Sequence, residues 1–210
     1  MDKMLFSFFS DQKVHKQLHR NHIVYRVKTN FTPVTKLTNQ GKLDWNSVIE
    51  SQTMDIDRNE TIINIIKCFK DRTFLILSKR VSQVEYLMKR LLEENIDATS
   101  LVGVKKHFDY NSRVLVATVQ KAGVGFDHSK LDSLIIASDV EEYFIQYLGR
   151  VFRREDTTPI IFDLVDNLKT LQNHYLTRRH IYLDHGGQIK NLILKHIPPQ
   201  YKNDFKQLSL

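Results

Sequence analysis

The sequence predicts an α/β domain built on a parallel β-sheet that helices flank. Two observations support this prediction. Short continuous apolar runs recur along the chain, and runs of this length are typical of strands that are buried on both faces. Segments with apolar residues at helical spacing separate these runs, and strands that alternate with helices form right-handed crossovers between parallel strands. A length of 210 residues fits one such domain with extensions at its ends.

The core of the domain is expected over residues 58–165. Its predicted strands are the apolar runs 73–77, 98–102, 114–117, 134–137 and 159–162. Helices are expected behind Asp57, which with Glu60 resembles a capping box, along the apolar stripe from Val84 to Leu92, and from Val140 to Val151. Because ligands of parallel sheets bind beyond the carboxyl ends of the strands, the loops that follow the strands are the expected positions of a site.

The first 57 residues are expected to form an N-terminal extension. Residues 23–31 alternate between apolar and polar side chains and precede Pro33, so they indicate an edge strand. Asp44 is a suitable N-cap for a short helix that follows it. The extension therefore adds a strand and a helix in front of the core.

Residues 166–210 are expected to form a C-terminal helical extension. A helix from about Leu168 to Leu183 carries a stripe of Leu and Tyr side chains, and Gly186-Gly187 ends it. The cluster Arg178-Arg179-His180 on this helix is expected to be a solvated face. The residues beyond the two glycines favour no single structure.

The composition gives a net charge of +7 and a pI near 9.4, which favours polyanionic partners such as nucleic acid. The basic excess does not lie in the core. Residues 73–165 carry 12 basic and 13 acidic side chains, whereas residues 1–72 carry 12 and 8, and residues 166–210 carry 7 and 3. Bulk charge is therefore a weak guide to the position of a site.

The cysteine content and the hydropathy constrain the location of the protein. The single cysteine, Cys68, excludes an internal disulfide and fits a reducing compartment. No apolar run approaches the ~20 residues that span a bilayer. The apolar start of the chain has Asp2 where a signal peptide has its basic region. We therefore expect an intracellular protein without a membrane partner.

The usual nucleotide and metal motifs are not found in this sequence. It contains no Gly-x-x-x-x-Gly-Lys-Ser/Thr loop, and no Gly-x-Gly-x-x-Gly opens a helix after a strand. The chain alone is therefore not expected to hold a nucleoside triphosphate. His15, His19 and His22 have helical spacing, but no cysteine or nearby carboxylate completes a ligand set, so no metal site is expected.

The segment from Gln146 to Arg154 carries the strongest chemical signal. It places Arg150 and Arg153 three residues apart at the end of a predicted helix, where both guanidinium groups can point at one phosphate. The alternative is a solvated basic helix end that complements the helix dipole. The dipole explains the positive charge, but it does not explain Gln146 and Gly149 at fixed positions before the arginines.

These residues resemble a known family. The pattern Gln-x-x-Gly-Arg-x-x-Arg from Gln146 to Arg153 is similar to motif VI of superfamily 2 helicases and translocases. Residues 75–80 resemble motif IV, and residues 114–118 with Gly125-Phe126-Asp127 resemble motif V. The resemblance covers about residues 58–165, more loosely 23–31. It is nearest to the C-terminal RecA-like lobe of the XPB and UvsW-like branch and to helicases of large cytoplasmic DNA viruses.

The resemblance implies a role for each matching residue. Arg150 and Arg153 would be arginine fingers for ATP, and Gln146 would link the nucleotide site to the acidic motif of the other lobe. Gly125 and Asp127 would meet the ribose side of the nucleotide. The residues that would contact nucleic acid are Thr118, Ser78 and Lys79. Two departures from the family pattern, His128-Ser129 after motif V and Phe152 within motif VI, loosen the assignment to a branch.

The resemblance also implies cofactors and partners. ATP and Mg would be bound mainly by an N-terminal RecA-like lobe that carries the Walker A and DExH/D motifs, so this chain alone is expected to be inactive. The nucleic acid is expected to be DNA more than RNA, and a viral source would place the protein in the cytoplasm, a viral factory or the virion. The competing hypotheses are a stand-alone, non-catalytic, basic nucleic-acid-binding module and a remodelling or repair protein that separates no strands.

Overall fold

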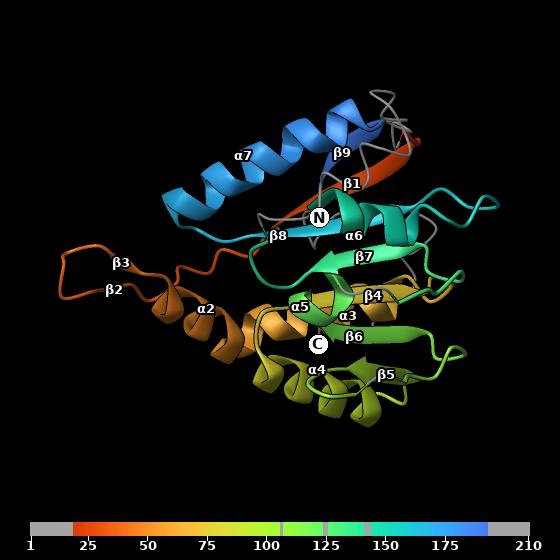
Figure 1. Ribbon diagram of the computed structural model, residues 1–210, viewed down its shortest axis with the longest axis horizontal. Coiled ribbons are helices and arrows are strands. Elements are labelled where there is room, and N and C mark those ends of the chain that lie inside the picture. Colours follow the sequence, from red (N-terminus) through yellow and green to blue (C-terminus); the bar gives the residue numbers. More distant parts are fainter. Residues whose placement is uncertain (1–18, 106, 124–125, 141–143, 193–210) are drawn as a thin grey trace, which may run out of the picture.

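A seven-stranded sheet organises the chain (Figure 1). The computed structural model describes residues 19–105, 107–123, 126–140 and 144–192. Every neighbouring pair of strands in this sheet is parallel. In spatial order the strands are β5 (Ala98–Leu101), β6 (Val114–Thr118), β4 (Phe74–Ser78), β7 (Ser133–Ile136), β8 (Ile160–Val165), β1 (His22–Lys28) and β9 (Gly187–Leu192). The predicted α/β fold with a parallel sheet is confirmed.

Helices cover both faces of the sheet. They are α2 (Trp45–Met54), α3 (Ile56–Cys68), α4 (Val81–Glu93), α5 (Val119–Gly123), α6 (Phe144–Val151) and α7 (Lys169–Asp184). Apolar side chains of α3 and α4 form one buried cluster with the sheet, and those of α5, α6 and Tyr182 of α7 form a second. A short antiparallel hairpin, β2 (Lys36–Leu37) and β3 (Leu43–Asp44), precedes α2. No helix within the described ranges is both long and apolar enough to cross a membrane.

The strand expected at the edge of the sheet lies inside it. Residues 22–28 form β1, which pairs with β8 on one side and with β9 on the other. The expectation of an edge strand is wrong because the chain beyond α7 returns as β9 and covers that edge. Gly186 permits this return, because it has a φ of +90° and a Cβ there would lie 2.8 Å from the carbonyl oxygen of Arg20. Segments on both sides of residues 58–165 thus contribute strands to one sheet.

The starts of the two helices after the hairpin differ in how well the sequence predicted them. Asp44 caps α2 as expected, since its carboxylate accepts a hydrogen bond from Asn46 N at 3.0 Å. The N-cap of α3 is Asp55, not Asp57, and its carboxylate accepts from Arg58 N at 2.7 Å. The capping box was misplaced because α2 extends to Met54, leaving Asp55 as the one extended residue between the helices.

Candidate functional site

The predicted nucleic-acid residues follow two neighbouring strands at the same edge of the sheet. β4 and β6 pair in parallel, with Ser78 opposite Thr118. Both strands are buried along their whole length because helices cover both of their faces. The first accessible side chains therefore come where each strand ends, at Lys79 and Arg80 after β4 and at Gln120 and Lys121 after Thr118. Parallel pairing brings these two sets together.

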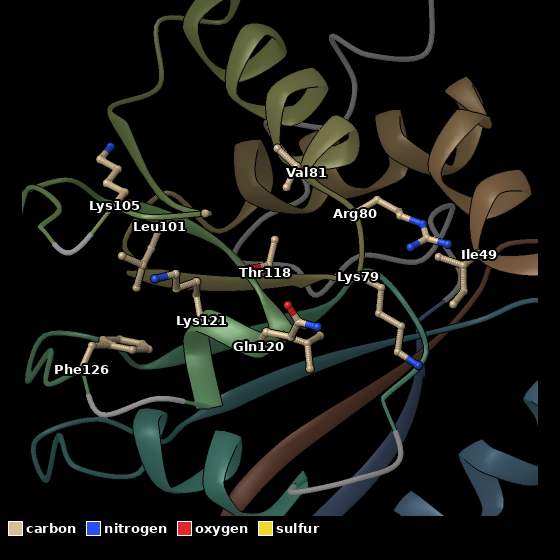
Figure 2. A pocket seen from close by; sticks show the side chains of 12 residues that line it. Ile49, Lys79, Arg80, Val81, Leu101, Lys105, Thr118, Gln120, Lys121 and Phe126 are labelled. Atoms are coloured by element: carbon tan, nitrogen blue, oxygen red, sulfur yellow. The ribbon is translucent and has the colours of Figure 1, made fainter. Parts of the chain in front are cut away.

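These residues line a groove of about 850 Å³. Its walls come from α2, the segments after β4 and β5, and the turn from β6 into α5, as Figure 2 shows. Four of the lining side chains are cationic: Lys79, Arg80, Lys105 and Lys121. Thr118 and Gln120 add polar groups, and Ile49, Leu101 and Phe126 add apolar surface. Cations around a partly apolar floor suit a phosphate backbone that carries aromatic bases.

Ser78 does not reach this groove. Its side chain is fully buried, and its hydroxyl lies 2.7 Å from Gln83 Oε1, to which it donates. The oxygen of the Ser78 hydroxyl also accepts a hydrogen bond from Arg80 N at 3.1 Å. A direct contact between the Ser78 hydroxyl and nucleic acid is therefore not supported by this geometry. Arg80, which the sequence interpretation did not single out, is half-buried and lines the groove instead, and Asn46 of α2 accepts a 2.7 Å hydrogen bond from its guanidinium.

The predicted arginine fingers lie close together, although not on one helical face. Arg150 is in the last turn of α6, and Arg153 lies beyond the end of this helix at Val151. Both contact the segment that follows α5. Arg150 donates to the carbonyl of Phe126 and its guanidinium carbon stacks 4.9 Å from that ring, while Arg153 forms an ion pair with Asp127. The structure thus joins the motif VI arginines to motif V.

The proximity of the two arginines affects their electrostatics. Burial lowers the pKa of the Arg150 guanidinium, and the positive charge of Arg153 lowers it further. The charge of Asp127 acts in the opposite direction on the same guanidinium. Gln146 is exposed on α6, one turn before Arg150, and Gly125 lies outside the described residues. An incoming polyanion would therefore meet two guanidinium groups whose mutual repulsion it could relieve.

Buried arginines hold the segment that joins β7 to α6 from opposite sides. On the α3 side, Arg58 is almost fully buried, bonds Asp166 and donates to the carbonyl of Ala137. On the α7 side, Arg178 donates to Asp139 Oδ1 at 2.9 Å and to the carbonyl of Val140 at 3.2 Å. Charged hydrogen bonds therefore hold the chain directly after β7, from Ala137 to Val140.

Arg178 is not part of a solvated face, so that expectation is wrong. Arg178 is 3% exposed, and its guanidinium makes two 2.8 Å hydrogen bonds to Asp163 within β8. Tyr182 donates to the same carboxylate at 2.7 Å, and His174 lies 2.8 Å from Asp139. The signal in the sequence was the four-residue spacing of His174, Arg178 and Tyr182, which places them on one face of α7.

Metal ligands do not gather among the residues that the structure describes. No group of three or more His, Cys, Asp or Glu side chains is placed to hold an ion there. Of the three histidines at helical spacing, His15 lies outside the described ranges and His22 is buried in β1. The site is built instead from cations, hydroxyls and amides, which are groups that bind phosphate.

Similar proteins occur in large DNA viruses. The chain is 43% identical over 211 residues to "Putative helicase 161L" of Invertebrate iridescent virus 6, covering 91% of this chain and 48% of that protein. It is 34% identical over 151 residues to "Putative helicase 055L" of Frog virus 3 (isolate Goorha), covering 71% of this chain and 34% of that protein. The chain thus spans half or less of the length of both relatives. No family model matches the sequence.

Solved structures with the same fold include T4 UvsW and a DEAD-box protein domain. The UvsW protein of T4 superposes with a TM-score of 0.58 at 20% identity, over 82% of this chain and 41% of that one. The C-terminal domain of the DEAD-box protein Dbp5 superposes with a TM-score of 0.57 at 10% identity, over 91% of this chain and 96% of that domain. These matches show the fold, and the viral relatives share the sequence. The chain therefore has the fold of a C-terminal RecA-like domain, and its sequence is similar to parts of two viral proteins named putative helicases.

Proposed function

We propose that this chain is the second lobe of an ATP-dependent nucleic-acid helicase or translocase. The observation that supports this most directly is the convergence of Arg150 and Arg153 on the Phe126-Asp127 segment. Two guanidinium groups without a phosphate loop suit a lobe that acts on a nucleotide held by another lobe. The names of the two viral relatives agree with this activity.

Arg150 and Arg153 would act on ATP as arginine fingers. ATP and Mg would be bound mainly by the N-terminal lobe, and ATP supplies the phosphoryl group that is transferred to water. The guanidinium of Arg153 would release Asp127 and bind phosphate oxygens. The guanidinium of Arg150 would release the Phe126 carbonyl and bind phosphate oxygens as well. Both charges would then stabilise the negative charge that develops on the transferred group, while Asp127 and Gly125 would lie toward the ribose.

The groove after β4 and β6 would hold the nucleic-acid strand. Lys79, Arg80 and Lys121 would contact phosphates, and the Thr118 hydroxyl would be a further backbone partner. Contacts of this kind carry little sequence information, which suits a protein that moves along a strand. DNA remains the preferred substrate in this proposal, with RNA as the alternative. Closure of the two lobes on ATP and their opening after hydrolysis would shift the grip along the strand.

ATP turnover by the protein that contains this chain and an ATP-binding lobe tests the proposal. Wild-type protein should hydrolyse ATP faster when single-stranded nucleic acid is added. Arg150→Ala and Arg153→Ala should each lower kcat by about three decades, as expected for the loss of an arginine finger. Arg179→Ala, which changes a cation of α7 outside the site, is the matched control and should keep wild-type turnover. Intact turnover in Arg150→Ala would show that the finger assignment is wrong.

Recombination of the lobes separates this proposal from a stand-alone binding module. The isolated chain should bind nucleic acid through its groove and show negligible ATP turnover, and addition of the N-terminal lobe should restore turnover. The groove itself favours the stand-alone module as the second candidate, because its cations need no other lobe to bind phosphate. Protein that never gains ATP turnover with any second lobe would support that candidate. Activity inside the cell, in the cytoplasm or a viral factory, is part of the proposal.

A further inference from the structure

A buried hydrogen-bond network joins the segment after β4 to the segment after β7. Its centre is Gln83 of α4, whose side chain is fully buried. Gln83 Oε1 accepts hydrogen bonds from two hydroxyls, Ser78 Oγ at 2.7 Å and Ser138 Oγ at 3.0 Å. Its Nε2 donates to Asn59 Oδ1 of α3 at 2.9 Å. One side-chain amide therefore connects two helices with the ends of two strands.

Ser138 also holds the main chain that presents the cations of the groove. Lys79 N donates to Ser138 Oγ at 3.1 Å. In return, Ala137 N and Ser138 N donate to the carbonyl of Leu77 at 3.0 and 3.2 Å. The main chain at Lys79 and Arg80 is thus tied to the end of β7, and a shift there must move Ser138 or break these bonds.

The residues after Ser138 lead toward the helix of the arginine fingers. Asp139 and the carbonyl of Val140 are held by Arg178 of α7. Val140 belongs to the buried cluster that contains Phe144 and Leu148 of α6. A displacement of Ser138 therefore acts on α6 through the packing of Val140 in this cluster.

We propose that Gln83 and Ser138 are positioning residues that couple nucleic-acid binding at Lys79 and Arg80 to the orientation of α6, and thereby to ATP hydrolysis. The coupling rests on the proposed function, because it requires both ligands. Phosphates bound by the two cations displace the main chain at Lys79. Ser138 and Gln83 follow, since a buried hydroxyl or amide that loses its partner is costly and the network has few alternative arrangements.

The test measures ATP turnover of the two-lobe protein with and without a single-stranded oligo(dT) of 40 nucleotides. Gln83→Met keeps the side-chain length and removes the acceptor of both hydroxyls, and Ser138→Ala removes one hydroxyl. The matched control is Ser133→Ala, a buried serine at the other end of β7 whose hydroxyl donates to Asp132 at 3.0 Å. The readouts are the ratio of stimulated to basal kcat, the KM for ATP and the Kd for the oligonucleotide.

The expected result is a loss of stimulation without a loss of binding. Gln83→Met should lower the stimulation ratio about tenfold, within the usual range of coupling between sites, and Ser138→Ala should lower it less. Basal kcat and the Kd for the oligonucleotide should stay near wild type in both, and Ser133→Ala should keep the full ratio. If Gln83→Met does not fold, Ser138→Ala against Ser133→Ala decides.

Two other results have distinct meanings. If the oligonucleotide stimulates wild-type turnover, and Gln83→Met and Ser138→Ala keep the wild-type ratio of stimulated to basal kcat, the coupling is overturned and the proposed function stays intact. Equal losses of basal and stimulated turnover in the two serine variants also overturn it, because the network then only stabilises the fold. If neither oligo(dT) nor oligo(U) stimulates wild-type turnover, the proposed function is overturned, and the coupling with it.

Discussion

Arg178 Nη2 lies 2.8 Å from Asp163 Oδ1, and this buried ion pair fastens α7 to the middle of β8. The same guanidinium bonds Asp139 at 2.9 Å, so one cation pairs with two carboxylates, one within β8 and one after the neighbouring β7. Burial alone would lower the pKa of Arg178, but the charge of Asp163 and the hydrogen bonds to it raise that pKa above its ordinary value. Arg178 therefore stays charged wherever the domain is folded.

Loss of the Arg178 charge should destabilise the domain strongly. Arg178→Met leaves two buried carboxylates without their cation, and we expect the free energy of unfolding to fall by about 3–5 kcal/mol. Urea unfolding followed by circular dichroism measures this loss. The neighbouring Arg179→Met is the control and should change stability by less than about 0.5 kcal/mol. Equal effects of the two substitutions would contradict the role of the buried pair.

Gly186→Ala should disturb the turn between α7 and β9. The alanine would adopt a φ of +90° and place its Cβ 2.8 Å from the Arg20 carbonyl oxygen, which is backbone and cannot swing away. Gly103→Ala is the matched control, because Gly103 has a φ of +55° and nothing within 4 Å of a Cβ. The control should lose about 1 kcal/mol from the left-handed backbone alone. A larger loss in Gly186→Ala, measured by thermal unfolding, is expected, and equal losses would argue against the close approach.

The stability of the domain should fall as the pH falls below about 6.5. Burial lowers the pKa of His22, whose Nδ1 donates to the Arg20 carbonyl at 2.7 Å while Nε2 has no hydrogen-bond partner. The unfolded chain therefore takes up this proton at a higher pH than the folded chain, and its uptake favours unfolding below the ordinary histidine pKa. Burial also lowers the pKa of His128, which adds an effect of the same sign.

Substitution of His22 isolates its share of this pH dependence. Urea midpoints at pH 7.5 and pH 5.5 should differ less in His22→Gln than in wild type, because the variant has no imidazole to protonate. His180→Gln, on the exposed side of α7, should keep the wild-type difference. An unchanged difference in His22→Gln would show that the buried imidazole is not the source.

Nucleic-acid binding by the groove should depend on salt, and Lys121 should contribute to that dependence. Lys121→Ala should lower affinity and reduce the slope of log K against log salt by about 0.7, the value for one phosphate contact to a single strand. Fluorescence anisotropy with labelled oligo(dT) at several salt concentrations measures both. Lys89→Ala removes a lysine that is 77% exposed on α4 and does not line the groove, so it should leave the slope unchanged.

The central strands were predictable because their local pattern is unambiguous. β4, β6, β7 and β8 are buried at every position, so each appears in the sequence as a short continuous apolar run. β9 has no such pattern, because Gln188, Lys190 and Asn191 are exposed and only Leu192 is buried. Its pairing with β1 depends on the return of the chain after α7, which no local pattern encodes, and the position of β1 inside the sheet was missed for the same reason.

The candidate site shows the same division between local and tertiary information. The sequence pattern placed Thr118 and Lys79 where two buried strands end, and β4 and β6 pair so that these two ends are neighbours. Accessibility was not predictable, because it depends on which partners the fold supplies. Ser78 is buried because Gln83 and Ser138 approach it, and Arg178 is buried because Asp139 after β7 and Asp163 within β8 converge on α7. A basic cluster in a sequence gives no sign of such distant acidic partners.

The position of β1 between β8 and β9 has a consequence for how the chain folds during synthesis. β1 leaves the ribosome before the other strands of this sheet, and its two partners follow more than 130 residues later. At the ordinary rate of translation, β1 waits about 7–28 s with both of its hydrogen-bonding edges open. Open edges of an apolar strand are templates for pairing with other chains. Completion of this sheet therefore depends on the nascent chain being shielded until its last strand has emerged.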